Sequence, residues 1–235
     1  MNPTIVRLAG QALLGRRRGL LLLALPIVLI VLATIIRVLT EPGVGSDVID
    51  ALGFGLALPL VALFAASAVL GPEIDDGSVV YLLAKPVSRH VVGFSKYAVA
   101  ALATIAFGAV PLLVAGLITD STEPDAAVGW LVGGAIAGAT YTAVFVAAAA
   151  TTRHAVVVGL LFVLLWEGLL GNLLDGIRWL SIGAWGREIA HAVGDAVSAP
   201  GTGLPYALIA SALVIAVSVW FTGDRLRSFS MRGET

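Results

Sequence analysis

The side chains that could do chemistry are few in this sequence, and the most informative group of them lies in one segment. Acidic residues come first in it and basic residues follow, in the order Glu73, Asp75, Asp76, Lys85, Arg89 and Lys96. Outside this segment, Glu167 stands near the end of an apolar stretch, and Glu188 and His191 have the i, i+3 spacing of metal ligands on a helix. A metal site needs more ligands than these two, so we expect neither a metal nor a cofactor on this chain.

The sequence lacks the motifs of the common catalytic sites. It contains no cysteine, which excludes disulfides, thiolate catalysis and cysteine-ligated metals. It also lacks His-Glu-x-x-His, Gly-x-Ser-x-Gly and the phosphate-binding pattern Gly-x-x-x-x-Gly-Lys-Ser/Thr. We therefore expect a protein that is not an enzyme and that does not hydrolyse ATP itself.

The elements that must position these side chains are too apolar for a soluble protein. Of the 235 residues, 59% are hydrophobic and 12% are charged, whereas roughly 25% are charged in a typical soluble domain. A membrane-spanning helix needs about 20 mostly apolar residues. We predict one all-α transmembrane domain over residues 1–235, with spans at about 19–40, 51–70, 97–119, 129–150, 155–170 and 204–222.

The placement of lysine and arginine predicts the orientation of these six spans. With the N-terminus in the cytoplasm, 11 of the 14 basic residues fall on the cytoplasmic side, and the outer loops are mostly acidic. The opposite orientation would place nearly all of the basic residues outside. We therefore expect a multi-pass protein of the cell membrane with both termini in the cytoplasm, and no nucleic-acid partner.

Two segments outside the spans have patterns of their own. Apolar residues within 3–17 fall at helical spacing on one face, which predicts an amphipathic helix lying in the cytoplasmic interface. Residues 171–203 mix Trp179 and Trp185 with charged residues. Because tryptophan is enriched at the headgroup level, this mixture favours short interfacial or re-entrant helices over a flexible surface loop.

Small residues and prolines also mark the spans. The fourth span contains the patterns Gly129-x-x-x-Gly133 and Gly134-x-x-x-Gly138, which predict close helix packing within one protomer or across a dimer. Three prolines predict kinks within the spans: Pro26, Pro59 and Pro111.

The charged segment 71–96, between the second and third spans, is the most informative part of the sequence. Proline suits the first position of a helix and acidic residues suit its positive end, so Pro72 and Glu73 predict the start of a short helix. Pro86 restricts the residue before it to extended shapes and ends that helix. Arg89 and Lys96 then form a basic return to the membrane. The alternative is a solvated connector whose charges only set the topology.

This segment resembles the first cytoplasmic loop in the permease subunits of type-2 ABC exporters. That loop has Glu, Gly, Leu-Leu, Pro-x-Ser-Arg and Lys in this order, and the matching residues here are Glu73, Gly77, Leu82-Leu83, Pro86-Val87-Ser88-Arg89 and Lys96. The interfacial helix, the six spans and the long segment before the last span extend the resemblance to the outline of the whole chain.

The resemblance implies a role in transport. In such exporters this loop carries a coupling helix that docks on a separate ATPase subunit, and the matching residues are Pro72, Glu73, Asp75, Asp76, Gly77, Val79 and Val80. ATP and Mg²⁺ would then bind to the ATPase and not to this chain. A second permease copy or a sister permease would complete the translocation path within the bilayer, with Glu167 as a candidate residue of that path or of its outer gate.

Two other functions stay open on the sequence alone. One is a secondary transporter or channel that works without ATP, and the other is a membrane scaffold that transports nothing. The spans are almost free of charged residues, which disfavours ion or proton coupling. Apolar spans suit a lipid-like or drug-like amphiphile better than a small ion as the substrate.

Overall fold

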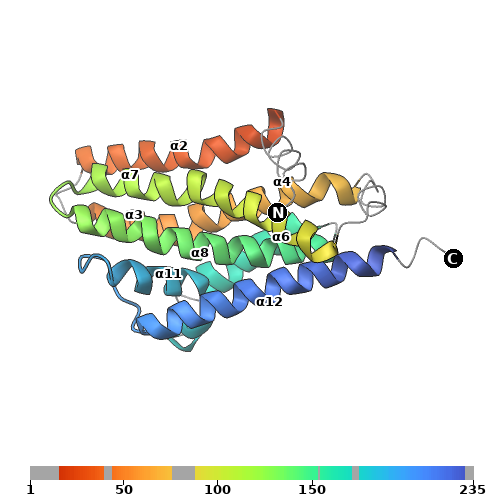
Figure 1. Cartoon of the computed structure of the whole chain (residues 1–235). Coiled ribbons are helices and arrows are strands. Elements are labelled where there is room, and N and C mark those ends of the chain that lie inside the picture. The colour runs from red at the N-terminus through yellow and green to blue at the C-terminus, as the bar shows by residue number, and fades with distance from the viewer. Residues whose placement is uncertain (1–15, 40–43, 76–87, 153, 171–174, 231–235) are drawn as a thin grey trace.

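The computed structural model describes residues 16–39, 44–75, 88–152, 154–170 and 175–230 (Figure 1). These residues form helices joined by turns and loops, with no β-strand among them. Five helical stretches are long and apolar enough to cross a membrane: Leu22–Leu39, Val48–Leu70, Arg89–Thr119, Pro124–Thr151 and Leu204–Leu226. The predicted all-α fold built on apolar helices is therefore confirmed, with five candidate spans.

Thirteen described elements make up the bundle, and several follow one another without a break. In chain order they are α2 (Arg16–Leu39), α3 (Val44–Leu52), η1 (Gly53–Ala57), α4 (Leu58–Asp75), α6 (Arg89–Thr104), η2 (Ile105–Ala109), α7 (Val110–Thr119), α8 (Pro124–Thr151), α9 (Ala155–Leu161), η3 (Phe162–Leu170), η4 (Asp175–Leu180), α11 (Ile182–His191) and α12 (Leu204–Ser230). We call the end of the bundle where α6 begins the Arg89 end. The opposite end, where α7 turns into α8, is the Asp120 end (Figure 1).

Helix α8 lies at the centre of the bundle. It packs against α4, α6, α7, α11 and α12, and it is the most buried of the candidate spans. By contrast, α12 is the least buried, and its exposed side chains include Ile209, Leu213 and Trp220. A helix that is apolar on every face suits the interior of a bundle or lipid, so this difference in burial separates the inner helix from the outer one.

The glycine patterns of α8 bring two other backbones close to it. A Cβ added at Gly129 would meet the carbonyl oxygen of Ala190, and one added at Gly133 would meet that of Gly186. Gly138 approaches Thr104 and Leu58 on another side of the helix. The predicted close packing therefore occurs within one protomer, with α11 against the first pattern.

Prolines account for two widened turns in the spans. The π-helical segments η1 and η2 end two residues before Pro59 and Pro111 respectively. Proline has no N–H to donate to the carbonyl four residues back, and its ring crowds that carbonyl. The turn before each proline opens instead, and the amides of Leu58 and Val110 bond five residues back, to Gly53 and Ile105. Pro26 lies inside α2, which stays α-helical throughout.

The chain between α8 and α12 departs most from a simple span. The apolar helix Ala155–Leu169 is shorter than the five candidate spans, and at about 1.5 Å per residue it falls short of the ~30 Å hydrocarbon core. The predicted outer segment 171–203 contains η4 and α11, and α11 buries most of its residues against the bundle. The predicted interfacial helix over 3–17 lies outside the described residues except for Arg16 and Arg17, with which α2 begins.

We predict that the α8–α11 contact fails when a side chain is placed between the two backbones. Gly133→Ala should lower the free energy of unfolding by about 1–3 kcal/mol, because its Cβ would meet a backbone carbonyl that cannot rotate away. Gly55→Ala is the matched control, since nothing lies within 4 Å of a Cβ added there. Equilibrium unfolding in detergent measures the free energy of unfolding of both variants. Equal losses of this free energy in the two variants would contradict the packing.

Candidate functional site

Charged and hydroxyl side chains gather around a pocket at the Asp120 end. Its volume is about 280 Å³, and it is lined by Asp50, Glu167, Arg178, Ser181, Ala184, Arg187, Ser198, Ala199 and Pro200. These residues come from α3, η3, η4, α11 and the segment that precedes α12. The pocket therefore depends on α11 staying packed in place.

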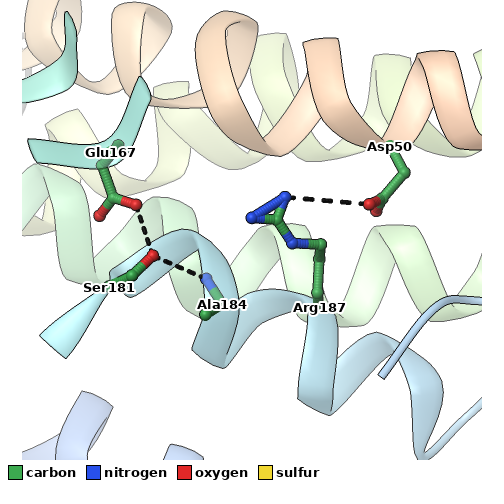
Figure 2. A network of polar contacts seen from close by, with 5 residues as sticks. All are labelled: Asp50, Glu167, Ser181, Ala184 and Arg187. Atoms are coloured by element: carbon green, nitrogen blue, oxygen red, sulfur yellow. Dashed lines mark hydrogen bonds and ion pairs between the residues drawn. The ribbon is translucent and has the colours of Figure 1, made fainter. Parts of the chain in front are cut away.

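Glu167 is buried beside this pocket and uses both of its carboxylate oxygens (Figure 2). Oε2 accepts a hydrogen bond of 2.6 Å from the Ser181 hydroxyl, and Oε1 accepts one of 2.9 Å from the backbone amide of Ile182. The Ser181 Oγ in turn accepts from the amide of Ala184 at 3.1 Å. Glu167 and Ser181 together thus satisfy two of the amides that the first turn of α11 leaves without helical partners.

This arrangement gives Glu167 a role that the sequence alone does not indicate. The carboxylate lies at the N-terminus of α11, where the helix dipole favours a negative charge. The donors of its two bonds, Ser181 and Ile182, follow Glu167 by 14 and 15 residues in the chain, so these bonds join η3 to α11. Glu167 therefore holds the start of α11, and it faces the predicted outer segment instead of standing alone at the end of a span.

The hydroxyl of Tyr141 on α8 lies close to this carboxylate. A Cβ added at Gly183 would be 3.2 Å from Tyr141 Oη and 3.3 Å from Glu167 Oε2. Tyr141 is fully buried. Because a side chain at position 183 would crowd both polar groups, glycine there lets α11 approach α8 beside Glu167.

An ion pair connects α11 to α3 across the pocket. Arg187 Nη1 lies 3.9 Å from Asp50 Oδ2, and both side chains are largely shielded, with 24% and 14% of their surface exposed (Figure 2). Among the described residues that line it, the pocket has two carboxylates, Asp50 and Glu167, and two guanidinium groups, Arg178 and Arg187. The formal charges of these four side chains sum to zero.

Glu188 and His191 hold the chain that follows α11. Glu188 Oε2 accepts hydrogen bonds from the amides of Gly201 and Thr202, at 2.9 and 3.0 Å. The ring nitrogen Nδ1 of His191 is 2.7 Å from the carbonyl oxygen of Val197. Glu188 and His191, at their i, i+3 spacing, thus bond to the backbone of the chain that follows. No group of three His, Cys, Asp or Glu side chains that could hold a metal lies within the described ranges.

Three aromatic residues pack together near the pocket. The ring of Tyr206 meets the rings of Trp179 and Trp185 edge to face, with centroids 5.0 and 6.3 Å apart. The carbonyl oxygen of Trp179 accepts hydrogen bonds from both Tyr206 Oη and Trp185 Nε1, at 2.8 and 3.0 Å. This aromatic cluster joins η4, α11 and the start of α12.

At the Arg89 end, the predicted loop is shorter than 71–96. Helix α6 begins at Arg89, because the Ser88 side chain accepts a hydrogen bond from the amide of Val91 and so caps it. Lys96 is therefore not a loop residue. It lies two turns inside α6, is 2% exposed, and donates from Nζ to the carbonyl oxygen of Val69 at 3.1 Å.

The acidic part of the predicted coupling segment differs as well. Helix α4 runs through Pro72 and ends at Asp75, so Pro72 lies in the last turn of α4 and not at the first position of a new helix. Glu73 and Asp75 likewise fall within α4 and do not follow the start of a new helix. The other predicted coupling and motif residues fall outside the described part of the chain: Asp76, Gly77, Val79, Val80 and Pro86.

The structure does not bring the sequence-predicted residues together into one site. Glu167 lies on η3 and lines the pocket, whereas Ser88, Arg89 and Lys96 lie at or near the start of α6. Asp50, Arg178 and Arg187 join Glu167 in the pocket, although the sequence indicates only that they belong to outer loops. These residues are far apart along the chain, so the sequence did not predict their contact. The Ser88 cap could have been predicted, because serine is a common N-cap and this one follows the helix-ending Pro86 and precedes an apolar stretch.

Comparison with known proteins assigns no family to this chain. No protein-family model matches it, and no curated protein matches it. What the loop motif implies about partners and transport therefore remains a proposal.

We predict that removing the Glu167 carboxylate loosens α11. Glu167→Ala should lower the free energy of unfolding by about 1–3 kcal/mol, because it leaves the buried Ile182 amide and Ser181 hydroxyl without their acceptor. Glu167→Gln should cost less, since its amide oxygen can still accept a bond. Hydrogen exchange of residues 182–191 should accelerate in Glu167→Ala but not in Glu123→Ala, whose side chain is exposed and caps no amide. Unchanged exchange of α11 in Glu167→Ala would refute this role.

Proposed function

We propose that this chain is the membrane-spanning permease subunit of an ATP-driven exporter, and that it works with a separate ATPase subunit in the manner of type-2 ABC exporters. The fold of apolar helices, the loop motif around Ser88, Arg89 and Lys96, and the absence of a phosphate-binding motif from the sequence support this proposal. ATP and Mg²⁺ belong to the partner ATPase.

The bond between Lys96 and Val69 is the observation that carries the proposal. It joins α6 to α4 near the helix ends that flank the loop, and both residues are buried. An ammonium group is costly to place inside an apolar bundle, so simple packing does not explain a lysine here. A direct bond between the two helices lets a force on the loop move α4 and α6 together, and both helices pack on α8.

The acidic residues at the end of α4 support an external partner. Glu73 and Asp75 lie in the last described part of α4, and with Asp76 they form an acidic run in the sequence. In this proposal, a basic surface on an ATPase subunit attracts this acidic run.

The proposal includes an orientation in the cell membrane. The Arg89 end faces the cytoplasm, because lysine and arginine are concentrated in the segments on that side. The helix Ala155–Leu169 is the fifth of six spans, and η4 and α11 form a re-entrant segment at the outer face. Glu167 then acts on the outer gate by holding α11.

A second permease copy completes the translocation path in this proposal. The apolar side chains exposed on α2 and α12, such as Ile27 and Ile209, are available for lipid or for that second copy. The cargo would be lipid-like or drug-like, because the described spans have few charged side chains to receive an ion.

Co-purification and charge reversal test the coupling to an ATPase. We expect an ATPase subunit to co-purify with the chain from native membranes in mild detergent. The double variant Glu73→Lys, Asp76→Lys should lose that partner, because like charges then face each other. The matched control Glu123→Lys, Asp195→Lys makes the same charge change at exposed positions near the opposite end and should keep it.

Three outcomes would count against the proposal. The first is the absence of any ATPase in the purified complex. The second is equal ATPase retention by the two double variants. The third is substrate uptake driven by an ion gradient in vesicles that contain only this chain, which would establish a secondary transporter.

A further inference from the structure

The two arginines of the Asp120-end pocket have hydrogen-bond donors to spare. A guanidinium group carries five N–H donors. Among the described residues, Arg178 makes one side-chain hydrogen bond, from Nη1 to the Pro200 carbonyl oxygen at 3.2 Å. Arg187 has the ion pair with Asp50, and its 3.9 Å is longer than a hydrogen bond. Both groups line the pocket, so their remaining donors suit a phosphate or carboxylate.

The carboxylates of the same pocket define the rest of the ligand. The formal charges of the four side chains sum to zero. A ligand with one negative and one positive group would therefore leave the filled pocket neutral. Asp50 lines the pocket beside Arg187, and we assign it as the carboxylate that faces a cation. None of the described residues that line the pocket is aromatic. Quaternary ammonium groups favour aromatic faces, whereas a primary ammonium donates hydrogen bonds to carboxylates, so the lining favours the primary amine.

The surroundings of the pocket indicate that the ligand is a lipid. Trp179 follows Arg178 directly and packs against Tyr206, and both aromatic side chains are exposed. Tryptophan and tyrosine concentrate where the bilayer meets water. Leu180 is 59% exposed beside them and offers an apolar surface to acyl chains.

We propose that this pocket binds the headgroup of a zwitterionic phospholipid with a primary amine, as in phosphatidylethanolamine. Arg178 and Arg187 hold the phosphodiester, and Asp50 accepts hydrogen bonds from the ammonium group. The site lies at the opposite end of the bundle from the Lys96–Val69 contact, and it does not depend on coupling to an ATPase.

Binding of soluble short-chain lipids tests this site. The purified chain in detergent is titrated with dihexanoyl-phosphatidylethanolamine, and native mass spectrometry counts the bound molecules. We expect saturable binding of one molecule. Dihexanoyl-phosphatidylglycerol lacks the amine and dihexanoyl-phosphatidylcholine carries a quaternary amine, so both should bind more weakly. Glycerophosphoethanolamine has the same headgroup without chains, and weaker binding of it than of the lipid would distinguish a lipid from a free phosphodiester.

Variants of the pocket test the assignment of each residue. Arg178→Gln should weaken binding of the ethanolamine lipid about tenfold, the value of one charge-assisted hydrogen bond. Asp50→Asn should reduce the preference for the ethanolamine lipid over the glycerol lipid. Arg37→Gln is the control, because Arg37 is an exposed arginine in the last turn of α2 and does not line the pocket.

The proposal is wrong if Arg178→Gln binds the lipid as tightly as the unmodified chain, or if Arg37→Gln weakens binding to the same extent. Arg178 is exposed and makes one hydrogen bond, so its replacement keeps the fold even where replacement of Arg187 does not. Equal binding of glycerophosphoethanolamine and the lipid would reject a lipid ligand in favour of a soluble phosphodiester.

Discussion

Backbone contact between α8 and α11 is the constraint on which the rest of this structure depends. Helix α11 has only ten residues, and so short a helix is marginal without tertiary packing. Gly129 and Gly133 remove the side chains that would keep it away from α8. Within a membrane, apolar helices gain little from the hydrophobic effect and associate through this kind of close packing. Once α11 is seated, its Ser181 reaches Glu167 and its Arg187 reaches Asp50, so the polar pocket follows from an apolar contact.

The central position of α8 links the two ends of the bundle. At the Asp120 end, α8 contacts α11, which positions the pocket; it also packs against α4 and α6, whose ends flank the loop at the Arg89 end. Each end has a buried charged group that bonds a neighbouring element, Glu167 to α11 and Lys96 to α4. Charged side chains are expensive in apolar surroundings. Their use at these two positions indicates that each end requires a defined arrangement of its helices.

Much of the fold could be predicted from the sequence, because the thickness of a bilayer sets the length of an apolar helix. Five of the six predicted stretches correspond to candidate spans, and the sixth is the short helix Ala155–Leu169. Local signals were less decisive. Pro72 suits the first turn of a helix, but it is also tolerated near the end of α4, so its type did not fix its position. The pocket could not be predicted, because the bonds of Glu167 and the Arg187–Asp50 pair join residues whose approach depends on how α11 packs.

A disulfide cross-link between α8 and α11 tests the central claim most directly. The chain has no cysteine of its own, so the introduced pair is the only one. A Cβ added at Gly186 would lie 2.7 Å from the Cβ of Ala137, so the two Cβ atoms must move about 1 Å apart to reach disulfide geometry. We predict that Ala137→Cys, Gly186→Cys loses both free thiols within one chain when native membranes are oxidised, whereas Ala137→Cys, Val193→Cys keeps them. Thiols that stay reactive in the first pair, or cross-links that form only between chains, would contradict the packing of α11 on α8.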